Sequence, residues 1–253
     1  MQDPRNLLIT GASSGIGEAL ALAYAAPGIA LTLSGRDAVR LEAIGAACRQ
    51  RGATVQTAIL DVTDAAAMAH WIDAADTTAP VDLVIANAGI GAGTEGGFET
   101  ADQTRAVFAV NLAGVLNTVL PLIPRFVARR RGQIALMSSL ASFRGFPGAP
   151  TYCASKAALR IWGEGLRGDL HRHGVEVSVI CPGFVVSRIT ARNKFRMPFL
   201  MSAERAAAII KRGLARNRGR IAFPFPMYFA IWFFSTLPPL LTDPLFRLLP
   251  KKE

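Results

Sequence analysis

The chain is predicted to fold as one α/β domain, a doubly wound parallel sheet with helices on both faces and an apolar C-terminal extension. Short apolar stretches typical of buried strands alternate with longer stretches of helical spacing from residue 6 to residue 181. Such alternation favours a parallel sheet that is covered on both faces. The length of 253 residues fits a single domain of this kind. No linker, repeat or low-complexity tract divides the sequence.

The individual elements follow from apolar periodicity and from the residues that interrupt it. Strands are predicted over residues 6–10, 30–34, 54–60, 83–86, 133–138, 175–181 and 220–223. Helices are predicted over residues 16–26, 37–51, 65–75, 102–127, 151–172 and 202–215. We expect Pro121 and Pro124 to bend or end the last turns of the long helix 102–127.

The composition predicts a folded, strongly basic protein. Hydrophobic residues make up 51% of the chain, charged residues 18%, and the net charge is +10. Residues 188–220 contain ten Lys or Arg and one acid, Glu204. An anionic cofactor, an anionic substrate or an acidic membrane surface fits this charge, and a solvated basic face is the plain alternative. Nucleic acid is disfavoured, because the stretch has only two aromatic residues, Phe195 and Phe199, and no recognised nucleic-acid-binding motif.

The cysteines and the N-terminus predict a cytoplasmic protein. The chain has an odd number of cysteines, Cys48, Cys153 and Cys181. Their spacing suits neither a disulfide framework nor a zinc site, so we expect small apolar core residues in a reducing compartment. The first five residues lead straight into an apolar strand, without the pattern of a signal peptide. The three histidines are scattered, and no metal site is predicted.

A glycine-rich turn joins the first strand to the first helix, with the sequence Thr10-Gly11-Ala12-Ser13-Ser14-Gly15-Ile16-Gly17. Glycine lets the backbone turn tightly and approach a pyrophosphate, while the helix N-terminus offers free N–H groups. A strand before and a helix after are the context that this fingerprint requires. An ordinary structural turn is the alternative. We predict a Rossmann-like sheet whose dinucleotide contacts here are Gly11, Ser13, Ser14, Gly15, Ile16 and Gly17.

The end of the second strand indicates which dinucleotide is bound. An acid at this point binds the adenosine 2′-hydroxyl, whereas an arginine accommodates a 2′-phosphate. The chain reads Ser34-Gly35-Arg36, so Arg36 favours NADP over NAD. Asp37 is a second candidate for the ribose, but its position suits the N-cap of the helix that follows.

Three further residues predict chemistry on a carbonyl. Tyr152 and Lys156 lie four residues apart on a predicted helix and so share a face. A nearby ammonium lowers the pKa of a phenol from its usual ~10, which makes the pair a general acid and base. Ser139 follows a strand, where its hydroxyl can bind an oxygen that gains negative charge. A surface tyrosine beside a solvated lysine is the alternative for the pair alone. With the glycine turn, the three residues predict a hydride-transferring enzyme.

From residue 6 to residue 187 the sequence resembles a classical short-chain dehydrogenase/reductase. The glycine turn matches the Thr-Gly-x-x-x-Gly-x-Gly signature of that family. Asp61-Val62 matches the segment that contacts adenine, and Asn111, Ser139, Tyr152 and Lys156 match the catalytic tetrad. Asn87-Ala88-Gly89 matches the strand-four signature, although Ala86 stands where a second asparagine is common. The segment beside the nicotinamide is matched by Pro182 and Gly183, with Ser187 in place of the usual threonine.

The resemblance implies a mechanism. Tyr152 exchanges a proton with the substrate oxygen, and Ser139 orients the carbonyl. Lys156 lowers the pKa of Tyr152 and binds the nicotinamide ribose, and Asn111 holds a water that links Lys156 to solvent. It also implies a homo-oligomer, a dimer or a tetramer. We treat residues 1–253 as one dinucleotide-binding catalytic domain, in which residues 188–253 form a substrate lid and the C-terminal extension.

The apolar tail leaves its role open. Residues 221–242 carry no charge, but four prolines interrupt them, and the longest free piece, 227–237, is ~16 Å long as a helix. That is too short to cross about 30 Å of hydrocarbon. The tail is either a buried roof over the substrate pocket, a subunit interface, or a peripheral membrane contact between basic flanks, the second of which contains Arg247, Lys251 and Lys252. Each alternative favours an apolar substrate such as a lipid, steroid-like or aromatic ketone.

Two other functional classes remain as alternatives. A protein that senses a dinucleotide without chemistry needs only the glycine turn, and the intact Ser139, Tyr152 and Lys156 argue against it. A module that binds lipid at a membrane surface would depend on the tail alone.

Overall fold

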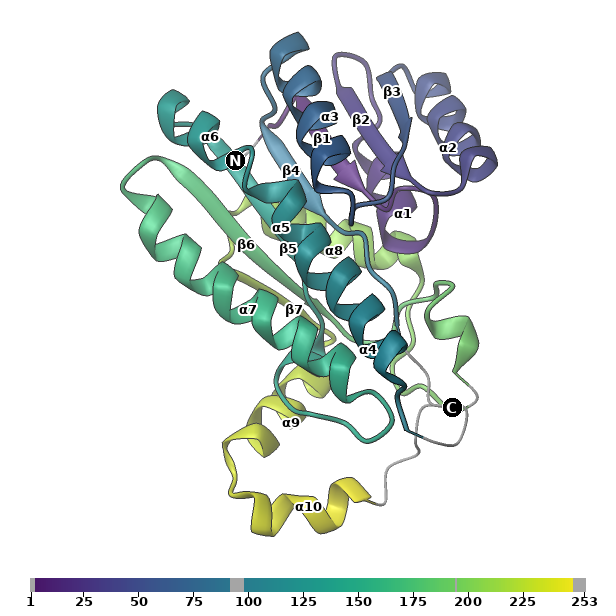
Figure 1. Ribbon diagram of the computed structural model, residues 1–253, viewed down its shortest axis with the longest axis vertical. Coiled ribbons are helices and arrows are strands. Elements are labelled where there is room, and N and C mark those ends of the chain that lie inside the picture. Colours follow the sequence, from purple (N-terminus) through teal and green to yellow (C-terminus); the bar gives the residue numbers. More distant parts are fainter. Residues whose placement is uncertain (1–2, 92–97, 194, 248–253) are drawn as a thin grey trace.

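The computed structural model describes residues 3–91, 98–193 and 195–247, and it contains one parallel sheet of seven strands (Figure 1). The strands lie in the order β3-β2-β1-β4-β5-β6-β7. Their bounds are β1 Asn6–Thr10, β2 Ala30–Gly35, β3 Thr54–Ile59, β4 Leu83–Ala86, β5 Gly132–Met137, β6 Val175–Pro182 and β7 Arg220–Phe223. The strand order reverses between β1 and β4, where open α/β sheets form a crevice for ligands. The predicted doubly wound fold is confirmed.

Helices lie on both faces of the sheet (Figure 1). Their bounds are α1 Gly15–Tyr24, α2 Ala38–Gln50, α3 Ala65–Thr78, α4 Ala101–Phe108, α5 Gly114–Val119, α6 Ile123–Arg129, α7 Pro150–His171, α8 Ala203–Ala215, α9 Phe225–Thr236 and α10 Pro239–Arg247. Asp37 accepts a hydrogen bond from the backbone N–H of Arg40. Its predicted role as the N-cap of α2 is therefore confirmed.

The long helix predicted over residues 102–127 is present, with two interruptions. A π-helical turn, Ala109–Ala113, joins α4 to α5, and the regular α-helical pattern is interrupted over residues 120–122 before α6 begins. Pro124 lies in the first turn of α6, where the missing proline N–H costs no helical hydrogen bond. The proline thus starts a helix instead of ending one. Residues 101–129 are long and apolar enough to cross a bilayer, but their side chains Val115, Val119 and Phe126 are buried against the sheet.

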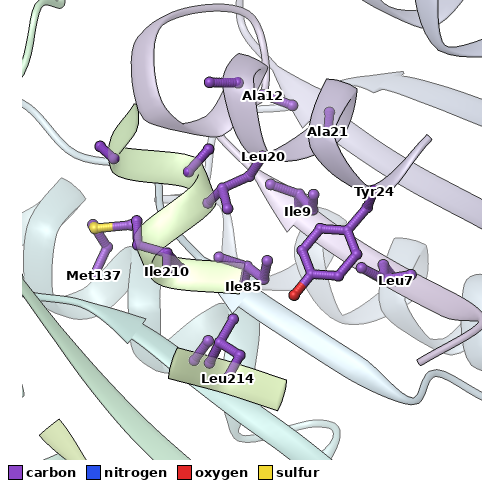
Figure 2. Close-up of a cluster of buried hydrophobic side chains, with 14 of the residues drawn as sticks. Leu7, Ile9, Ala12, Leu20, Ala21, Tyr24, Ile85, Met137, Ile210 and Leu214 are labelled. Atoms are coloured by element: carbon purple, nitrogen blue, oxygen red, sulfur yellow. The ribbon is translucent and has the colours of Figure 1, made fainter. Parts of the chain in front are cut away.

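Alternate side chains of the strands enter two separate cores. Leu7 and Ile9 of β1 belong to a core shared with α1, α2 and α8, while Leu8, between them, belongs to a core shared with α3, α5, α6 and α7. This is the period of two that a strand buried on both faces requires. Figure 2 shows the first core, where Leu20 and Tyr24 of α1 lie close to the strands and α8 contributes Ile210, Leu214 and their neighbours. All three cysteines are buried, as predicted.

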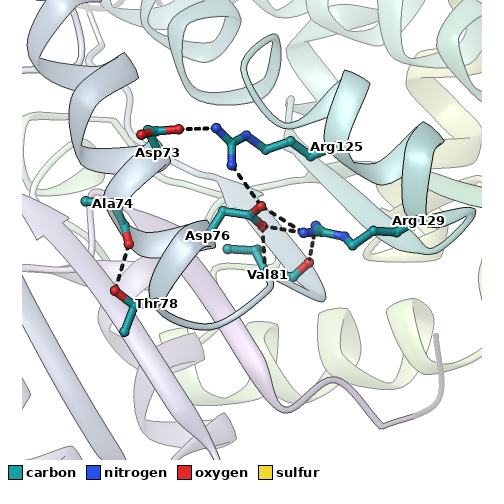
Figure 3. Close-up of polar contacts among 7 residues, drawn as sticks. All are labelled: Asp73, Ala74, Asp76, Thr78, Val81, Arg125 and Arg129. Atoms are coloured by element: carbon teal, nitrogen blue, oxygen red, sulfur yellow. Dashed lines mark hydrogen bonds and ion pairs between the residues drawn. The ribbon is translucent and has the colours of Figure 1, made fainter.

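A buried carboxylate joins α3 to α6 beneath the second core (Figure 3). Asp76, only 6% exposed, accepts hydrogen bonds from Arg129, Arg125 and the backbone N–H of Val81. Burial raises the pKa of this carboxyl, but the three donors outweigh burial, and the pKa is lowered overall. The network therefore holds a buried carboxylate in its charged form, because Arg129, Arg125 and Val81 all donate hydrogen bonds to it.

The apolar tail folds into α9 and α10 at the carboxyl end of β5, β6 and β7, next to the start of α7 (Figure 1). The break between these helices falls at Pro238, as the prolines predicted. The alternative of a buried roof does not describe α9, because Ile231 is its only buried residue among the described side chains. Among the residues that the structure describes, the side of this helix with Ile231, Met227 and Tyr228 is the one that packs against the sheet.

Candidate active site

A cavity of about 690 Å³ opens at the carboxyl ends of the central strands. Nearly all of the residues selected from the sequence line it: Gly11, Ser13, Ser14, Gly15, Ile16, Arg36, Asp61, Val62, Asn87, Ala88, Gly89, Ser139, Tyr152, Lys156, Pro182, Gly183 and Ser187. Gly17 and Asn111 do not line it. The structure thus gathers most of the predicted cofactor and catalytic residues around one space, which spans the topological switch point of the sheet.

The glycine turn has no room for side chains. Gly11 and Gly15 have φ angles of +66° and +60°, in the left-handed region that favours glycine. A Cβ on Gly17 would lie 2.3 Å from the carbonyl oxygen of Gly11. Gly17 is thus required for the first turn of α1 to pack against the loop, and its predicted contact with the dinucleotide is not supported. Ser14 makes no side-chain cap, so the N–H groups that begin α1 are left for an anion.

The strand-four motif holds this turn in place. The side-chain amide of Asn87 donates to the carbonyl oxygens of Thr10 and Gly11, at 3.0 and 3.1 Å. The hydroxyl of Thr10 accepts the backbone N–H groups of Asn87 and Ala88. A Cβ on Gly11 would lie 2.8 Å from the Cα of Ala88. The two motifs therefore form one locked unit, which needs a small residue on each side.

Basic groups surround the end of the cavity formed by the second and third strands. Arg36 lines it, and its guanidinium lies 3.7 Å from the carboxylate of Asp61. The pKa of Asp61 is lowered, chiefly by the hydrogen bond from the backbone N–H of Thr63. Arg40, which the sequence analysis missed, also lines the cavity and pairs with Asp37 at 2.8 Å. Its Nε is buried without a hydrogen-bond partner among the described residues. The signal for Arg40 was its spacing, since it lies four positions after Arg36 on the first turn of a helix.

Ser139, Tyr152 and Lys156 meet at the other end of the cavity. Ser139 follows β5, and its hydroxyl is hydrogen-bonded to that of Tyr152, from α7. Lys156 lies one turn further along α7, with its Nζ 5.8 Å from the centre of the Tyr152 ring. The ammonium is almost fully buried and donates to the carbonyl oxygen of Met137, at 2.8 Å. A phenol, a hydroxyl and an ammonium thus face one space from two elements, as the spacing predicted.

The pKa shifts at this site follow from burial. Burial raises the pKa of Tyr152, and the hydrogen bond with Ser139 acts in the opposite direction. Burial also lowers the pKa of Lys156 from 10.5 to about 8. The expectation that Lys156 lowers the pKa of Tyr152 is not met, because loss of water around the phenol outweighs other contributions and the ammonium points to Met137. Burial thus brings the pKa of Lys156 closer to neutral pH than its ordinary value.

Asn111 lies behind the cavity, in the π-helical turn. Its side chain accepts from the backbone N–H of Ile90 at 2.8 Å and donates to the carbonyl oxygen of Ile90 at 3.0 Å. A Cβ on Gly89 would lie 3.2 Å from the Oδ1 of Asn111 and 3.4 Å from the Nζ of Lys156. Glycine at position 89 thus keeps a gap open between the amide and the ammonium. Such π-helical turns occur frequently at functional sites.

The segment after β6 closes the cavity from the opposite side. Ser187 lies beside the glycine turn, because a Cβ added to Gly15 would be 3.1 Å from the Cβ of Ser187. Its backbone N–H donates to the hydroxyl of Thr190, and this hydroxyl also donates to the carbonyl oxygen of Val185. Arg188, Ile189 and Thr190 line the cavity too, and the sequence analysis did not select them individually. Pro182 and Gly183 stand next to Ser139, whose hydroxyl lies 3.5 Å from the carbonyl oxygen of Pro182.

The cavity fits a dinucleotide in volume and in chemistry. Glycines line the part where a pyrophosphate needs a close approach, an uncapped helix start faces it, and arginines stand at one end. Ser139, Tyr152 and Lys156 stand at the other end. A nicotinamide dinucleotide requires this order, with basic groups at its adenosine end and reactive side chains at its nicotinamide end.

Comparison with known proteins gives the family. Residues 5–196 match the family model described as short chain dehydrogenase. An uncharacterized oxidoreductase of Myxococcus xanthus is 41% identical over 224 residues, 88% of each chain. One from Mycobacterium tuberculosis is 33% identical over 246 residues, 94% of this chain and 96% of the relative. The chain belongs to the short-chain dehydrogenase family, and it is an NAD(P)-dependent oxidoreductase.

Solved structures agree with this assignment. A short-chain dehydrogenase from Sphingobium yanoikuyae in complex with NADPH has a TM-score of 0.81 and 27% identity, with coverage of 98% of this chain and 97% of that chain. A relative from Burkholderia phymatum in complex with NAD also has a TM-score of 0.81 and 27% identity, with coverage of 100% and 98%. A nicotinamide cofactor is therefore supported. The two structures hold different dinucleotides, so the preference must be argued from the residues of this chain.

Proposed function

We propose that the protein is an NADP-dependent reductase or dehydrogenase that interconverts an apolar ketone and its secondary alcohol. The observation that carries the proposal is the hydrogen-bonded pair of Ser139 and Tyr152 beside the buried ammonium of Lys156, in the cavity that also contains the glycine turn. A chain that only sensed the dinucleotide would have no need of this arrangement.

The side chains support a simple sequence of proton movements. The Ser139 hydroxyl donates a hydrogen bond to the substrate oxygen and holds it beside Tyr152. In the direction of reduction, Tyr152 donates its phenolic proton to this oxygen as it gains negative charge. When bound, the nicotinamide supplies the hydride for reduction and accepts it for oxidation. Lys156 would hold the nicotinamide ribose, and the gap beside Gly89 would take the water that the family resemblance implies between Lys156 and Asn111. Replacement of the Tyr152 proton then needs no large movement.

Arg36 and Arg40 support NADP as the cofactor. Both line the cavity, and the Nε of Arg40 is buried without a partner among the described residues. Asp37, the other candidate for the ribose, is engaged by the backbone N–H and the guanidinium of Arg40. A 2′-phosphate would supply the anion that two neighbouring guanidinium groups favour. NAD offers no such group.

The apolar character of the catalytic end supports an apolar substrate. Ile90, Val110, Met137, Val185 and Ile189 line the cavity together with the catalytic residues. The segment beginning at Arg188 contributes to this lining, which supports the predicted substrate lid. The aromatic helix α9 packs against the same edge. A lipid, steroid-like or aromatic ketone fits these surroundings better than a sugar or a small polyol.

Kinetics with both cofactors test the proposal. Wild-type protein should reduce long apolar ketones faster than short polar ones and prefer NADPH to NADH. Tyr152→Phe should lower kcat by about 10²–10⁴-fold, because it removes the proton donor. Arg36→Ala should raise the KM for NADPH by about tenfold or more and leave the KM for NADH unchanged. If the wild type binds NADPH but oxidises it no faster than Tyr152→Phe across the ketones, the sensing alternative replaces the enzyme. A preference for sugars would contradict the apolar substrate.

A further inference from the structure

Helix α9 has two faces of opposite character. Ile231 is buried with Leu140, Val179 and Cys181 at the sheet edge, and Met227 and Tyr228 pack against the same cluster. The other face consists of Phe225, Phe229, Trp232 and Phe233, which are spaced as one helical stripe and are 42–69% exposed. A helix whose second face is aromatic instead of polar does not satisfy the usual pattern of a surface helix.

These exposed rings are gathered into one layer. The ring centre of Phe229 lies 6.0 Å from that of Trp232, and its centres to Phe225 and Phe233 are 6.2 and 6.4 Å apart. On α10, Leu240 and Leu241 are 85% and 66% exposed. We call these six residues of α9 and α10 the aromatic face. The four rings form a contiguous apolar surface, and exposed surface of this kind marks an interaction site.

Polar and packing contacts hold the aromatic face in a fixed position. The Tyr228 hydroxyl interacts with the guanidinium of Arg220 at 3.2 Å, and the Tyr228 ring meets that of Phe143 edge to face. On α10, Asp243 pairs with Arg144 at 2.7 Å. Both helices are thus tied to the catalytic domain by partners on β7 and on the loop after β5. The aromatic face is a surface of the folded domain.

The charge of the protein decides between the partners that could cover this face. The chain carries +10, and the described residues 183–193 and 195–203, which follow β6 at the same end of the sheet, contain three basic residues and no acid. The described acids nearby include Glu164, which is paired with Arg160 and with the Arg220 that contacts Tyr228. Glu99, Asp102 and Asp243 are engaged by Thr151, Arg105 and Arg144. A second copy would bring like charge against like charge. An anionic lipid surface offers the opposite charge and an interface where Trp and Phe side chains are favoured.

We infer that the aromatic face docks onto an anionic lipid bilayer, with α9 and α10 lying in the plane of the membrane surface. At 12 residues α9 is about 18 Å long, which suits an interfacial helix and is too short to span about 30 Å of hydrocarbon. The rings and the two leucines enter the headgroup region, while the basic groups stay at the anionic surface. The inference does not depend on the proposed cofactor or substrate.

Vesicle binding of the full chain tests the inference. Wild-type protein is sedimented with vesicles of phosphatidylcholine alone and with vesicles of phosphatidylcholine and phosphatidylglycerol in equal parts. We expect at least about tenfold stronger binding to the anionic vesicles, which falls as salt is added. The triple variant Phe229→Ser, Trp232→Ser, Phe233→Ser should lose at least about tenfold of this binding, because its inserting side chains are gone. Leu120→Ser, Ile161→Ser removes exposed apolar side chains elsewhere and should bind as the wild type does.

Fluorescence gives a second reading that needs no destabilising change. Brominated lipid should quench part of the wild-type tryptophan emission, and Trp232→Phe should remove this quenching while it retains vesicle binding. The triple variant should turn over a soluble ketone with NADPH at a rate within about twofold of wild type. This result would show that the substitutions affect docking and not chemistry. Equal binding of the wild type and the triple variant would overturn the inference. So would the absence of quenching, or dissociation of a wild-type oligomer in the triple variant with vesicle binding unchanged.

Discussion

The glycine turn and the aromatic face lie at the same edge of the sheet but are packed in opposite ways. At the turn every contact is enclosed: a single added methyl group on Gly17 would meet a carbonyl oxygen at 2.3 Å. On α9, four aromatic side chains extend into solvent and touch mainly one another. The difference shows that the size and hydrophobicity of a side chain do not measure how strongly its position is constrained. Here the glycines are the most constrained residues, and the large aromatic residues are the least. The effect of a substitution should scale with enclosure.

The largest effect on stability should come from Asp76→Ala. Removal of this carboxylate leaves the guanidinium of Arg129 and the N–H of Val81 without their partner in a buried network. We expect a loss of about 3–5 kcal/mol in the free energy of unfolding, measured with urea. Asp102→Ala is the matched control, because Asp102 is paired with Arg105 but has a side chain that is 97% exposed. An equal loss in the two variants would contradict the dependence on enclosure.

Gly17→Ala should also destabilise the protein, by less than Asp76→Ala. The added Cβ forces the first turn of α1 away from Gly11, so we expect a loss of about 1–3 kcal/mol in stability and weaker NADPH binding, measured by urea unfolding and by titration.

Gly165→Ala in α7 makes the same chemical change where nothing lies within 4 Å. Alanine is the better helix former, so this variant should instead be stabilised by about 0.5–1 kcal/mol. If Gly17→Ala and Gly165→Ala changed the free energy of unfolding in the same direction, the packing of the turn would not be the cause of the loss at Gly17.

Lys156→Met should stabilise the protein in a pH-dependent way. The pKa of Lys156 is about 8 in the folded protein and 10.5 as its ordinary value, so the unfolded chain binds more protons between these values. Wild-type stability from this group therefore rises from pH 8 to pH 10.5 and is lowest below pH 8. The variant should be more stable by on the order of 1–2 kcal/mol at pH 7, with the advantage gone near pH 10.5, in unfolding curves across this range. An advantage independent of pH would exclude the buried ammonium as its cause.

The smallest effect should be that of Leu240→Ala on the aromatic face. This side chain is 85% exposed, and we expect a change within about 0.5 kcal/mol in thermal or urea unfolding. Ile231→Ala, on the enclosed side of α9, should cost about 2–5 kcal/mol instead. Comparable losses at the two positions would mean that the aromatic face is covered in solution.

The central sheet, and the meeting of Ser139, Tyr152 and Lys156 at one cavity, could be predicted from the sequence because local rules determine them. The glycine turn requires particular φ angles, and the spacing of Tyr152 and Lys156 on a helix fixes a common face. The sequence did not predict that burial would raise the pKa of Tyr152, since solvent exclusion depends on segments distant in the chain. Arg40 was missed because its meaning depends on where the second and third strands end. The exposure of α9 was not predictable either. An apolar sequence indicates that a segment favours burial, but it does not indicate whether the fold buries it.

The contact between α9 and the segment after β6 has one more consequence. At Gly183, a Cβ would lie 3.0 Å from Pro224 and 3.1 Å from the sulfur of Met227. Gly183, which lines the cavity, is therefore in close contact with the helix that carries the exposed rings. A ketone dissolved among lipid tails would have a short route to Tyr152, without passing through bulk water. The enzyme would then sample the concentration of its substrate in the bilayer, where an apolar molecule accumulates, and its apparent affinity would depend on how much lipid is present.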